Sequence, residues 1–289
     1  MNTIYDYFGI TRQAASQACR RLEKREALTA EFIALVGDIR IEHPRMGLRK
    51  IYHMLKPLPV GRDRFEVLMR NEQLGAKRFR PAWKTTIPQD AIRGTNLLDG
   101  RVLTGPHQAW VTDISYFALP GRFAYIIVIM DVYTRVILSA HASLSLDGEQ
   151  NLIALNHALR ITVEERGRII TIHHSDRGTQ YIDKAYLDAL RKARMRISMC
   201  AAPQQNAYVE RVFGTLKHEY LYHLSITSLE TLRRELARTV KLYNEKRPHS
   251  SLPDALPPRA YYEMVQALPA RERSELRIHP YAPDKWVNG

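Results

Sequence analysis

The sequence predicts an α/β fold, in which a mixed five-stranded sheet with flanking helices follows an all-α region. Between residues 107 and 243, short β-branched segments alternate with segments whose apolar residues recur every three or four positions, a pattern typical of strands and helices. Before residue 76 only the helical period occurs, interrupted by glycine and proline. The chain of 289 residues is long enough to give each region its own core.

We expect four segments along the chain. Residues 1–76 form a helical, helix-turn-helix-like region, 77–106 a basic linker, 107–225 the α/β domain and 226–289 a C-terminal helical extension. The linker carries proline, glycine and asparagine with little periodicity, which is typical of a connecting segment.

The composition excludes several classes of protein. No run approaches the roughly 18 apolar residues of a membrane span, and the first ten residues lack the basic-then-apolar order of a signal peptide. Cys19 and Cys200 are the two cysteines, so we expect neither a disulfide framework nor a cysteine zinc site. A reducing cytoplasm fits this cysteine usage.

The charge balance indicates a polyanionic partner. The net charge is +13 and the isoelectric point is about 9.8, values typical of nucleic-acid-binding proteins, although a basic soluble enzyme can share them. Residues 1–107 hold 19 Lys and Arg against 11 Asp and Glu, whereas residues 108–225 hold 13 against 11. The first third is therefore the predicted region of non-specific contact with DNA.

Two pairs of helices in the first segment resemble helix-turn-helix units. In the first pair, residues 2–8 and 11–22 flank a turn at Gly9, and Thr11 can cap the second helix. The second helix is rich in Gln, Ser and Arg, which favours contact with DNA, but simple packing of a helical hairpin gives the same pattern.

The second pair follows a helix with an apolar stripe at residues 32–39. Helices are expected at 48–55 and from 62 to 73, separated by a break at 57–61. The second of these helices opens on two arginines, which either meet phosphate or base edges or form a solvated basic face. The predicted DNA contacts of this region and of the linker are Arg62, Arg64, Lys77, Arg78 and Arg80.

The α/β domain opens on three predicted strands at residues 110–117, 124–131 and 135–141, whose spacing suits an antiparallel meander. We expect Trp110 and Tyr116 in the core. The remaining elements are a helix at 148–165, a strand at 168–174, a helix at 183–194, a strand at 196–199 and helices at 206–223 and 228–243. This order is that of an RNase H-like α/β layer.

Three acidic residues lie where this order predicts the ends or interior of rigid elements. Asp113 lies inside the first apolar strand, where a carboxylate is costly unless it is paired or metal-bound. Asp176 follows the fourth strand, a usual site position in open α/β sheets. Glu210 lies on the helix at 206–223. Taken one at a time, each of these residues can also be interpreted as an ordinary surface acid or as one half of a salt bridge.

The helix at 206–223 has two different faces. Its apolar stripe consists of Val209, Val212, Phe213, Leu216 and Tyr220. Asn206, Glu210, Gly214 and Lys217 recur on another face, which places a carboxylate, a glycine and a lysine along one line. We expect a DNA strand to lie along this line.

Five segments together resemble a known family. The segments WVTDISYF (110–117), HHSDRGTQY (173–181), NAYVERVFGTLKHE (206–219) and YNEKRPHSSL (243–252) resemble the catalytic-frame, OrfB-type product of bacterial insertion sequences, a relative of retroviral integrases. In the N-terminal helical region, HPRMGLRKIYHML is similar to the same family. The resemblance covers roughly residues 40 to 260 and agrees in content and order.

The resemblance implies a DDE transposase in which Asp113, Asp176 and Glu210 hold Mg²⁺ or Mn²⁺, with two ions, for DNA nicking by water and strand transfer by the released 3′-OH. It implies element ends and target DNA as partners, identical chains assembled on DNA, and fusion to or help from an upstream-frame DNA-binding protein. It places the protein at the bacterial nucleoid, in the cytoplasm, with no membrane partner. Further matching residues, expected to contact DNA, are Arg177, Asn206, Lys217 and Arg247.

The sequence departs from the family before its third acid. Only 33 residues separate Asp176 from Glu210, fewer than is usual in the family. Gln205 stands where the family has an aspartate, and Arg211 where it has a small polar residue. A surface loop tolerates such a deletion, so an active enzyme and a diverged or decayed copy both remain open.

Other candidate ligands are assigned structural roles. We expect Asp131 to fix the turn after the second strand and Glu219 to pair with a neighbour. His173 and His174 lack His or Cys partners at zinc-site spacing, so a structural role or a DNA contact is expected. Two rivals to a transposase remain: a structure-selective nuclease of the RNase H type, and a DNA-binding relative, domesticated or decayed, without catalysis.

Overall fold

The computed structural model describes residues 5, 7–76, 95–166, 170–200 and 203–279. The chain divides into two compact units, residues 1–77 and 78–289, which are called the first and second unit below. In the described part, no helix is long and apolar enough to cross a membrane.

The first unit consists of α2 (Arg12–Glu42), α3 (Leu48–Leu55) and α4 (Arg62–Asn71). Phe32 and Val36 of α2 pack with residues of α3 and α4 in a buried core. The helices predicted from residues 48 and 62 are thereby confirmed.

The first predicted helix pair is wrong in its second member, because residues 11–22 and the stripe at 32–39 belong to one helix of 31 residues, α2. Good helix formers without proline fill the stretch between them, so nothing interrupts the helix. Thr11 caps it as expected, since its Oγ1 accepts a hydrogen bond from the Ala14 N–H at 3.0 Å. Residues 1–4 and 6, in the other member of the pair, lie outside the described residues.

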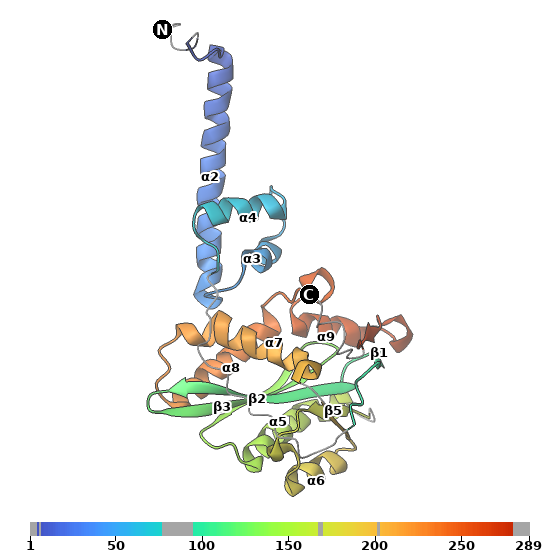
Figure 1. Ribbon diagram of the computed structural model, residues 1–289. Helices are drawn as coiled ribbons and strands as arrows, with labels where there is room; N and C mark the ends of the chain where they lie inside the picture. Colours follow the sequence, from blue (N-terminus) through green and yellow to red (C-terminus); the bar gives the residue numbers. More distant parts are fainter. Residues whose placement is uncertain (1–4, 6, 77–94, 167–169, 201–202, 280–289) are drawn as a thin grey trace, which may run out of the picture. The chain divides into compact units, whose positions relative to one another are not determined.

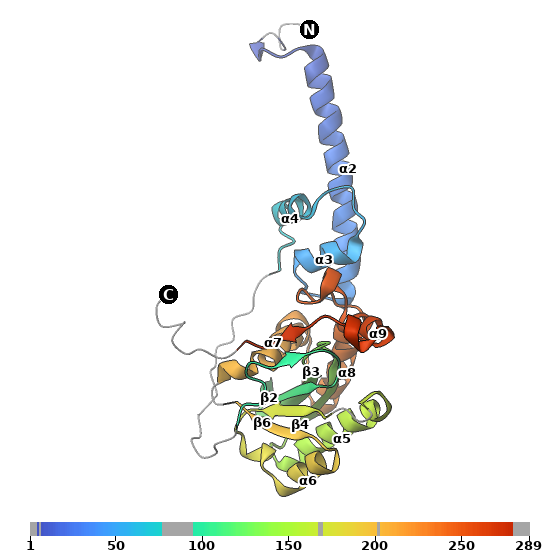
Figure 2. The same cartoon turned by 90° about the vertical axis from the view of Figure 1, so that its right-hand side faces the viewer.

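The second unit is built on a five-stranded sheet with the order β4-β3-β2-β5-β6 (Figures 1 and 2). The strands are β2 (Ala109–Leu119), β3 (Arg122–Asp131), β4 (Ile137–Ser143), β5 (Ile172–Ser175) and β6 (Arg196–Met199). β2, β3 and β4 form an antiparallel meander, and β5 and β6 continue the sheet in parallel with β2. The predicted RNase H-like fold is confirmed.

Helices cover both faces of this sheet. One face packs against α5 (Gly148–Arg166) and α6 (Lys184–Lys192), and the other against α7 (Ala207–Thr215) and α8 (Leu229–Glu245) (Figures 1 and 2). Neighbouring residues of β2 alternate accordingly: Trp110 joins the core on the α5 side and Val111 the core on the α7 side. The side of β2 on which a residue falls therefore decides which helices it meets.

The predicted helix at 206–223 is not uniformly wound. α7 is followed by a π-helical turn (Leu216–Tyr220) and a 3₁₀ turn (Leu221–His223). The predicted apolar stripe is nevertheless buried along its whole length.

Part of the predicted linker and of the C-terminal extension is paired. β1 (Val102–Leu103) pairs antiparallel with β7 (Leu276–Arg277) in a separate two-stranded sheet. Leu98 and Leu103 are buried in the core of the second unit, so residues 97–103 are not an extended connection. In the extension, α9 (Pro258–Ala267) follows α8.

The turn after β3 is fixed by Asp131, as expected. This fully buried carboxylate accepts hydrogen bonds from the His107 N–H at 2.8 Å, the Thr134 N–H at 2.8 Å and the Thr134 hydroxyl at 2.6 Å. It thereby ties the start of β2 to the turn between β3 and β4.

We expect Asp131→Asn to lower the free energy of unfolding by about 2–4 kcal/mol. Both carboxylate oxygens of Asp131 accept hydrogen bonds, whereas the NH₂ group of an asparagine cannot accept one, so at least one of the three donors would lose its partner. Urea unfolding followed by circular dichroism measures the change. Asp188→Asn, on the surface of α6, is the control and should change stability by less than about 1 kcal/mol. Equal stability of the two variants would contradict the role of Asp131.

Candidate active site

β2 positions the first predicted acid, Asp113, on the side of the sheet that α7 covers. Alternation along the strand puts Val111, Asp113 and Ser115 on one side, and Val111 packs in the core with α7. The Ile114 N–H donates a hydrogen bond of 2.8 Å to Asp113 Oδ1. The carboxylate is partly buried.

Asp176 lies directly beyond β5, next to the same part of β2. β5 pairs in parallel with β2, with Val111 opposite His174, so continuing this register brings Asp176 beside Asp113. The Gly178 N–H donates a hydrogen bond of 3.0 Å to Asp176 Oδ1, which orients the carboxylate.

α7 is attached to β2 on either side of Glu210. The Asn206 amide donates a hydrogen bond of 3.0 Å to the Thr112 carbonyl. In the π-helical turn, the Lys217 ammonium donates to Ser115 Oγ at 2.6 Å and to the Tyr116 carbonyl. Glu210 itself is exposed. Its helix thus lies against the strand that carries Asp113.

The three carboxylates influence one another electrostatically. Burial, followed by the charge of Asp176 and with a smaller contribution from Glu210, raises the pKa of Asp113 to about 7. Burial also raises the pKa of Asp176 and of Glu210. Lys217 is the cation of this cluster, and burial lowers its pKa to about 8. Over the described residues, however, no three His, Cys, Asp or Glu form a group that could hold a metal ion.

A pH dependence of stability follows from the raised pKa of Asp113. Between about pH 4 and pH 7 the folded, metal-free protein keeps a proton that the unfolded chain has lost, so stability falls as pH rises. We expect Asp113→Asn to remove this loss and to gain about 1–3 kcal/mol on wild type between pH 5 and pH 8. Urea unfolding of both proteins in EDTA at several pH values measures this gain. If the stabilities of wild type and Asp113→Asn change with pH in parallel, the prediction is contradicted.

The predicted DNA contacts of the second unit lie mostly inside the protein. Asn206 and Lys217 are buried against β2, and Arg177 donates a hydrogen bond of 3.1 Å from Nε to the Cys200 carbonyl. Arg247 forms a buried ion pair with Glu219, at 2.8 Å between Nε and Oε2. The guanidinium of Arg247 is thus directed at the Glu219 carboxylate.

In the first unit, Arg62 and Arg64 are exposed, whereas Lys77, Arg78 and Arg80 lie outside the described residues.

The expected pairing of Glu219 with a neighbour is confirmed, since the neighbour is Arg247. The two histidines have structural roles: His173 Nε2 lies 2.9 Å from the Tyr186 hydroxyl, and His174 Nδ1 lies 2.8 Å from Ser198 Oγ. Burial lowers the pKa of both, to about 3 for His173 and about 4 for His174, so both are neutral at pH 7.

The expectation for the two aromatic residues of β2 was half right. Trp110 is fully buried, but Tyr116 is 37% exposed near the far end of the strand, where it contacts Phe123 and Tyr125.

Tyr181 is a site residue that the sequence did not single out, although it ends the segment HHSDRGTQY. It is buried, and its pKa is raised well above the ordinary value, first by burial and then by the charges of Asp113 and Asp176. Its hydroxyl therefore stays protonated beside the two carboxylates.

Comparison with known proteins gives consistent family matches. A family model described as "Integrase core domain" matches residues 104–204, and a second model with this description matches residues 191–258. The 31 kDa protein of insertion element IS600 from Shigella sonnei is 30% identical over 81% of this chain and 88% of its own length.

Two further relatives are transposases by name. The transposase of insertion sequence IS629 from Shigella sonnei is 28% identical, over 77% of each chain. A putative transposase of IS986/IS6110 from Mycobacterium tuberculosis is 27% identical over 92% of this chain and 96% of its own.

Solved structures with some similarity include retroviral integrases. The HTLV-2 integrase catalytic core domain in complex with magnesium is 14% identical, with a TM-score of 0.45 over 55% of this chain and 97% of that chain. The simian T-cell lymphotropic virus intasome in complex with PP2A regulatory subunit B56 gamma is 17% identical, with a TM-score of 0.44 over 74% of this chain and 69% of that chain.

Proposed function

Because the chain belongs to the family of bacterial insertion-sequence transposases with an integrase core domain, we propose that it cuts DNA at the ends of its element and joins the 3′-OH ends to a target. Asp113, Asp176 and Glu210 are the proposed catalytic residues. The observation that supports this proposal is the electrostatic link among the three acids: burial, then the charge of Asp176 and a smaller contribution from Glu210, raise the pKa of Asp113.

The chemistry of these carboxylates suits a divalent cation. Three acids with one lysine leave an excess of negative charge, and their hard oxygen donors are the ligands that Mg²⁺ and Mn²⁺ prefer. We assign the direct contacts first to Asp113 and Asp176, which adjoin in the sheet, with Glu210 as the third ligand. When bound, two such ions would activate the attacking oxygen and neutralise charge on the scissile phosphate.

The protein's own groups hold this arrangement in place. The N–H groups of Ile114 and Gly178 orient the carboxylates of Asp113 and Asp176. Lys217, in the π-helical turn after α7, donates a part-buried hydrogen bond to Ser115 of β2, which helps to hold the helix of Glu210 against the strand of Asp113.

An assay that separates cleavage from joining tests the proposal. A duplex carrying one end of the element is incubated with the protein and Mg²⁺ or Mn²⁺, and a pre-cut duplex with a free 3′-OH is incubated with a target plasmid. A transposase nicks the first and joins the second. A nuclease of the RNase H type cuts without joining, and that result would overturn the proposal.

A second candidate function is a DNA-binding relative without catalysis. It is favoured by the exposed Glu210 and by the lack, in the described part of the chain, of a closed three-residue metal group. Such a protein binds the element ends but neither nicks nor joins them with either metal.

The proposed partners are the element ends and target DNA, other copies of this chain assembled on that DNA, and an upstream-frame DNA-binding protein, fused or separate. The place of action that follows is the bacterial nucleoid. The net charge of +13 supports the DNA partner.

A further inference from the structure

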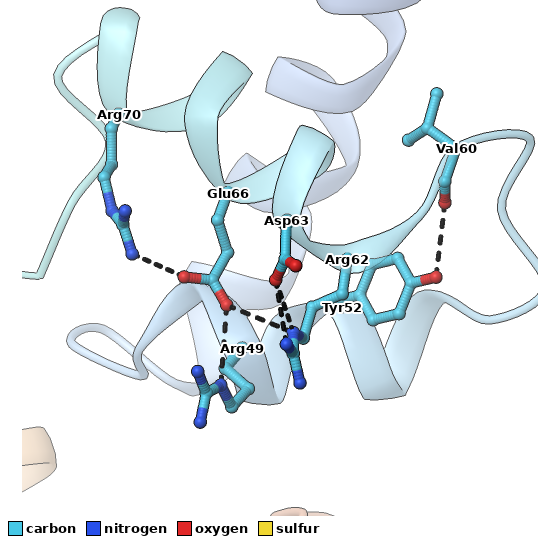
Figure 3. A network of polar contacts seen from close by, with 7 residues as sticks. All are labelled: Arg49, Tyr52, Val60, Arg62, Asp63, Glu66 and Arg70. Carbon is cyan, nitrogen blue, oxygen red and sulfur yellow. Dashed lines mark hydrogen bonds and ion pairs between the residues drawn. The ribbon is translucent and has the colours of Figure 1, made fainter.

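In the first unit, one carboxylate gathers three arginines (Figure 3). Glu66, on α4, is buried, with 10% of its side chain exposed. Its Oε2 accepts a hydrogen bond of 2.5 Å from Arg70, while Arg49 Nε lies 3.5 Å and Arg62 Nε 4.0 Å from its Oε1. The arginines come from two helices, α3 and α4, so Glu66 brings charges of both helices to one place.

These arginines remain available to a ligand. Their side chains are 62% (Arg49), 43% (Arg62) and 62% (Arg70) exposed. Glu66 Oε1 is buried and accepts no hydrogen bond, so it attracts Arg49 and Arg62 by charge, and Arg62 also donates a hydrogen bond of 2.9 Å to Asp63. Each guanidinium has five N–H donors in a fork that matches phosphate oxygens, and most of these donors are not used by Glu66.

Two of the three arginines lie in the first turns of helices. Arg49 lies in the first turn of α3 and Arg62 in the first turn of α4, and neither helix has a side-chain cap at its N-terminal glycine, Gly47 or Gly61. Cations at this end of a helix are unfavourable for the helix dipole, whereas a bound anion is favourable. A phosphate here would meet both the guanidiniums and helix N–H groups.

We propose that Arg49, Arg62 and Arg70 form a contact for the DNA phosphate backbone, and that Glu66 is the positioning residue that sets their spacing. This contact rests on the proposed action on DNA but concerns binding alone, without metal. Nearby Asp63 pairs with Arg62 at 2.8 Å, so Arg49 and Arg70 are the stronger DNA contacts of the three. Because phosphates carry no sequence information, the contact fixes position and not sequence choice.

Binding of the full-length protein to duplex DNA in EDTA, over a range of salt concentrations, tests the arginines. We expect Arg49→Gln and Arg70→Gln each to weaken binding about three- to tenfold near 0.1 M salt and to lower the salt slope by about 0.9. The loss should be equal for two unrelated duplex sequences. Lys192→Gln, an exposed site on α6 with the same charge change, is the control and should change binding less than about twofold.

Substitution of Glu66 distinguishes a contact in which the arginines are positioned from one that depends only on net charge. Glu66→Gln adds one positive charge to the protein, as does the control Glu72→Gln at the exposed end of α4. If only charge matters, both variants bind DNA more tightly. If Glu66 positions the arginines, Glu66→Gln binds about threefold or more weakly while Glu72→Gln does not.

Arg49→Lys provides a second measurement should Glu66→Gln melt early by circular dichroism. It keeps the charge but loses the planar fork, so we expect it to bind more weakly than wild type. Unchanged binding in both arginine-to-glutamine variants, or tighter binding by a folded Glu66→Gln, would overturn the proposal. Because no metal is present, neither result bears on the proposed catalytic residues.

Discussion

Replacing Asp113 or Asp176 by Asn is expected to abolish DNA nicking, with a rate loss of about a thousandfold or more, while DNA binding in EDTA stays unchanged. Asp113 lies on β2 and Asp176 directly beyond the neighbouring strand β5, and the loss of either carboxylate removes a proposed ligand of the site. Metal-based charge stabilisation contributes several kcal/mol to such reactions, and each 1.36 kcal/mol is tenfold in rate. Single-turnover nicking of an end-labelled duplex measures the loss.

The same nicking assay tests the role of the third acid, Glu210. Glu210→Gln should also remove nicking if this residue completes the site when DNA is bound. Asp188→Asn, on α6 across the sheet, should nick at the wild-type rate. Full activity in Asp113→Asn or Asp176→Asn would refute the assignment. An inactive wild type that still binds element ends favours the DNA-binding relative without catalysis.

Replacing Arg247 by Leu is expected to lower the free energy of unfolding by about 3–5 kcal/mol. Arg247 and Glu219 are only 5% and 17% exposed in their side chains, with two contacts of 2.8 and 2.9 Å between guanidinium and carboxylate. Removing the cation leaves a mostly buried carboxylate without the guanidinium that neutralises it, which is far more costly than breaking a surface pair. Urea unfolding measures the change.

The control for Arg247 is Arg238→Leu on α8, whose guanidinium is 52% exposed and 3.8 Å from Glu235, so the pair should contribute less than about 1 kcal/mol. The double variant Arg247→Leu, Glu219→Leu should recover part of the loss, because it removes both charges together. If Arg247→Leu keeps full stability but binds DNA more weakly, the sequence-based expectation of a DNA contact is right after all.

The strand context of Asp113 and Asp176 was predictable, but their proximity was not visible in a linear pattern. An apolar strand around Asp113 and a strand ending before Asp176 follow from periodicity alone. Their proximity depends on the parallel pairing of β2 with β5, which a single sequence does not encode as a local signal. The resemblance to a family supplied that link.

The segment at 206–223 shows what a helical period can predict. Asn206 and Lys217, expected on one line, both contact β2, but Glu210 of the same line is exposed. A helical period says which residues share a face, but not whether that face meets solvent, DNA or another element. In the structure both residues bond to β2: Asn206 donates to the Thr112 carbonyl, and Lys217 donates to Ser115 Oγ and to the Tyr116 carbonyl.

Other differences have local causes. An apolar strand predicts Tyr116 in the core, but only one face of the strand is buried there: Phe117 is buried, whereas Tyr116 is partly exposed beside Phe123 and Tyr125. The strands β1 and β7 are two residues each, too short for any period to reveal.

The pairing of β1 with β7 also constrains how the protein is made. The Ile278 N–H donates to the Arg101 carbonyl at 2.8 Å, and Leu98, Leu103 and Ile278 share one core. A ribosome delivers residue 101 long before residue 278, and domains fold as their parts emerge. β1 therefore has no β7 to pair with while the whole five-stranded sheet is being synthesised. The nascent α/β unit stays open along this seam until residues 276–278 have left the ribosome.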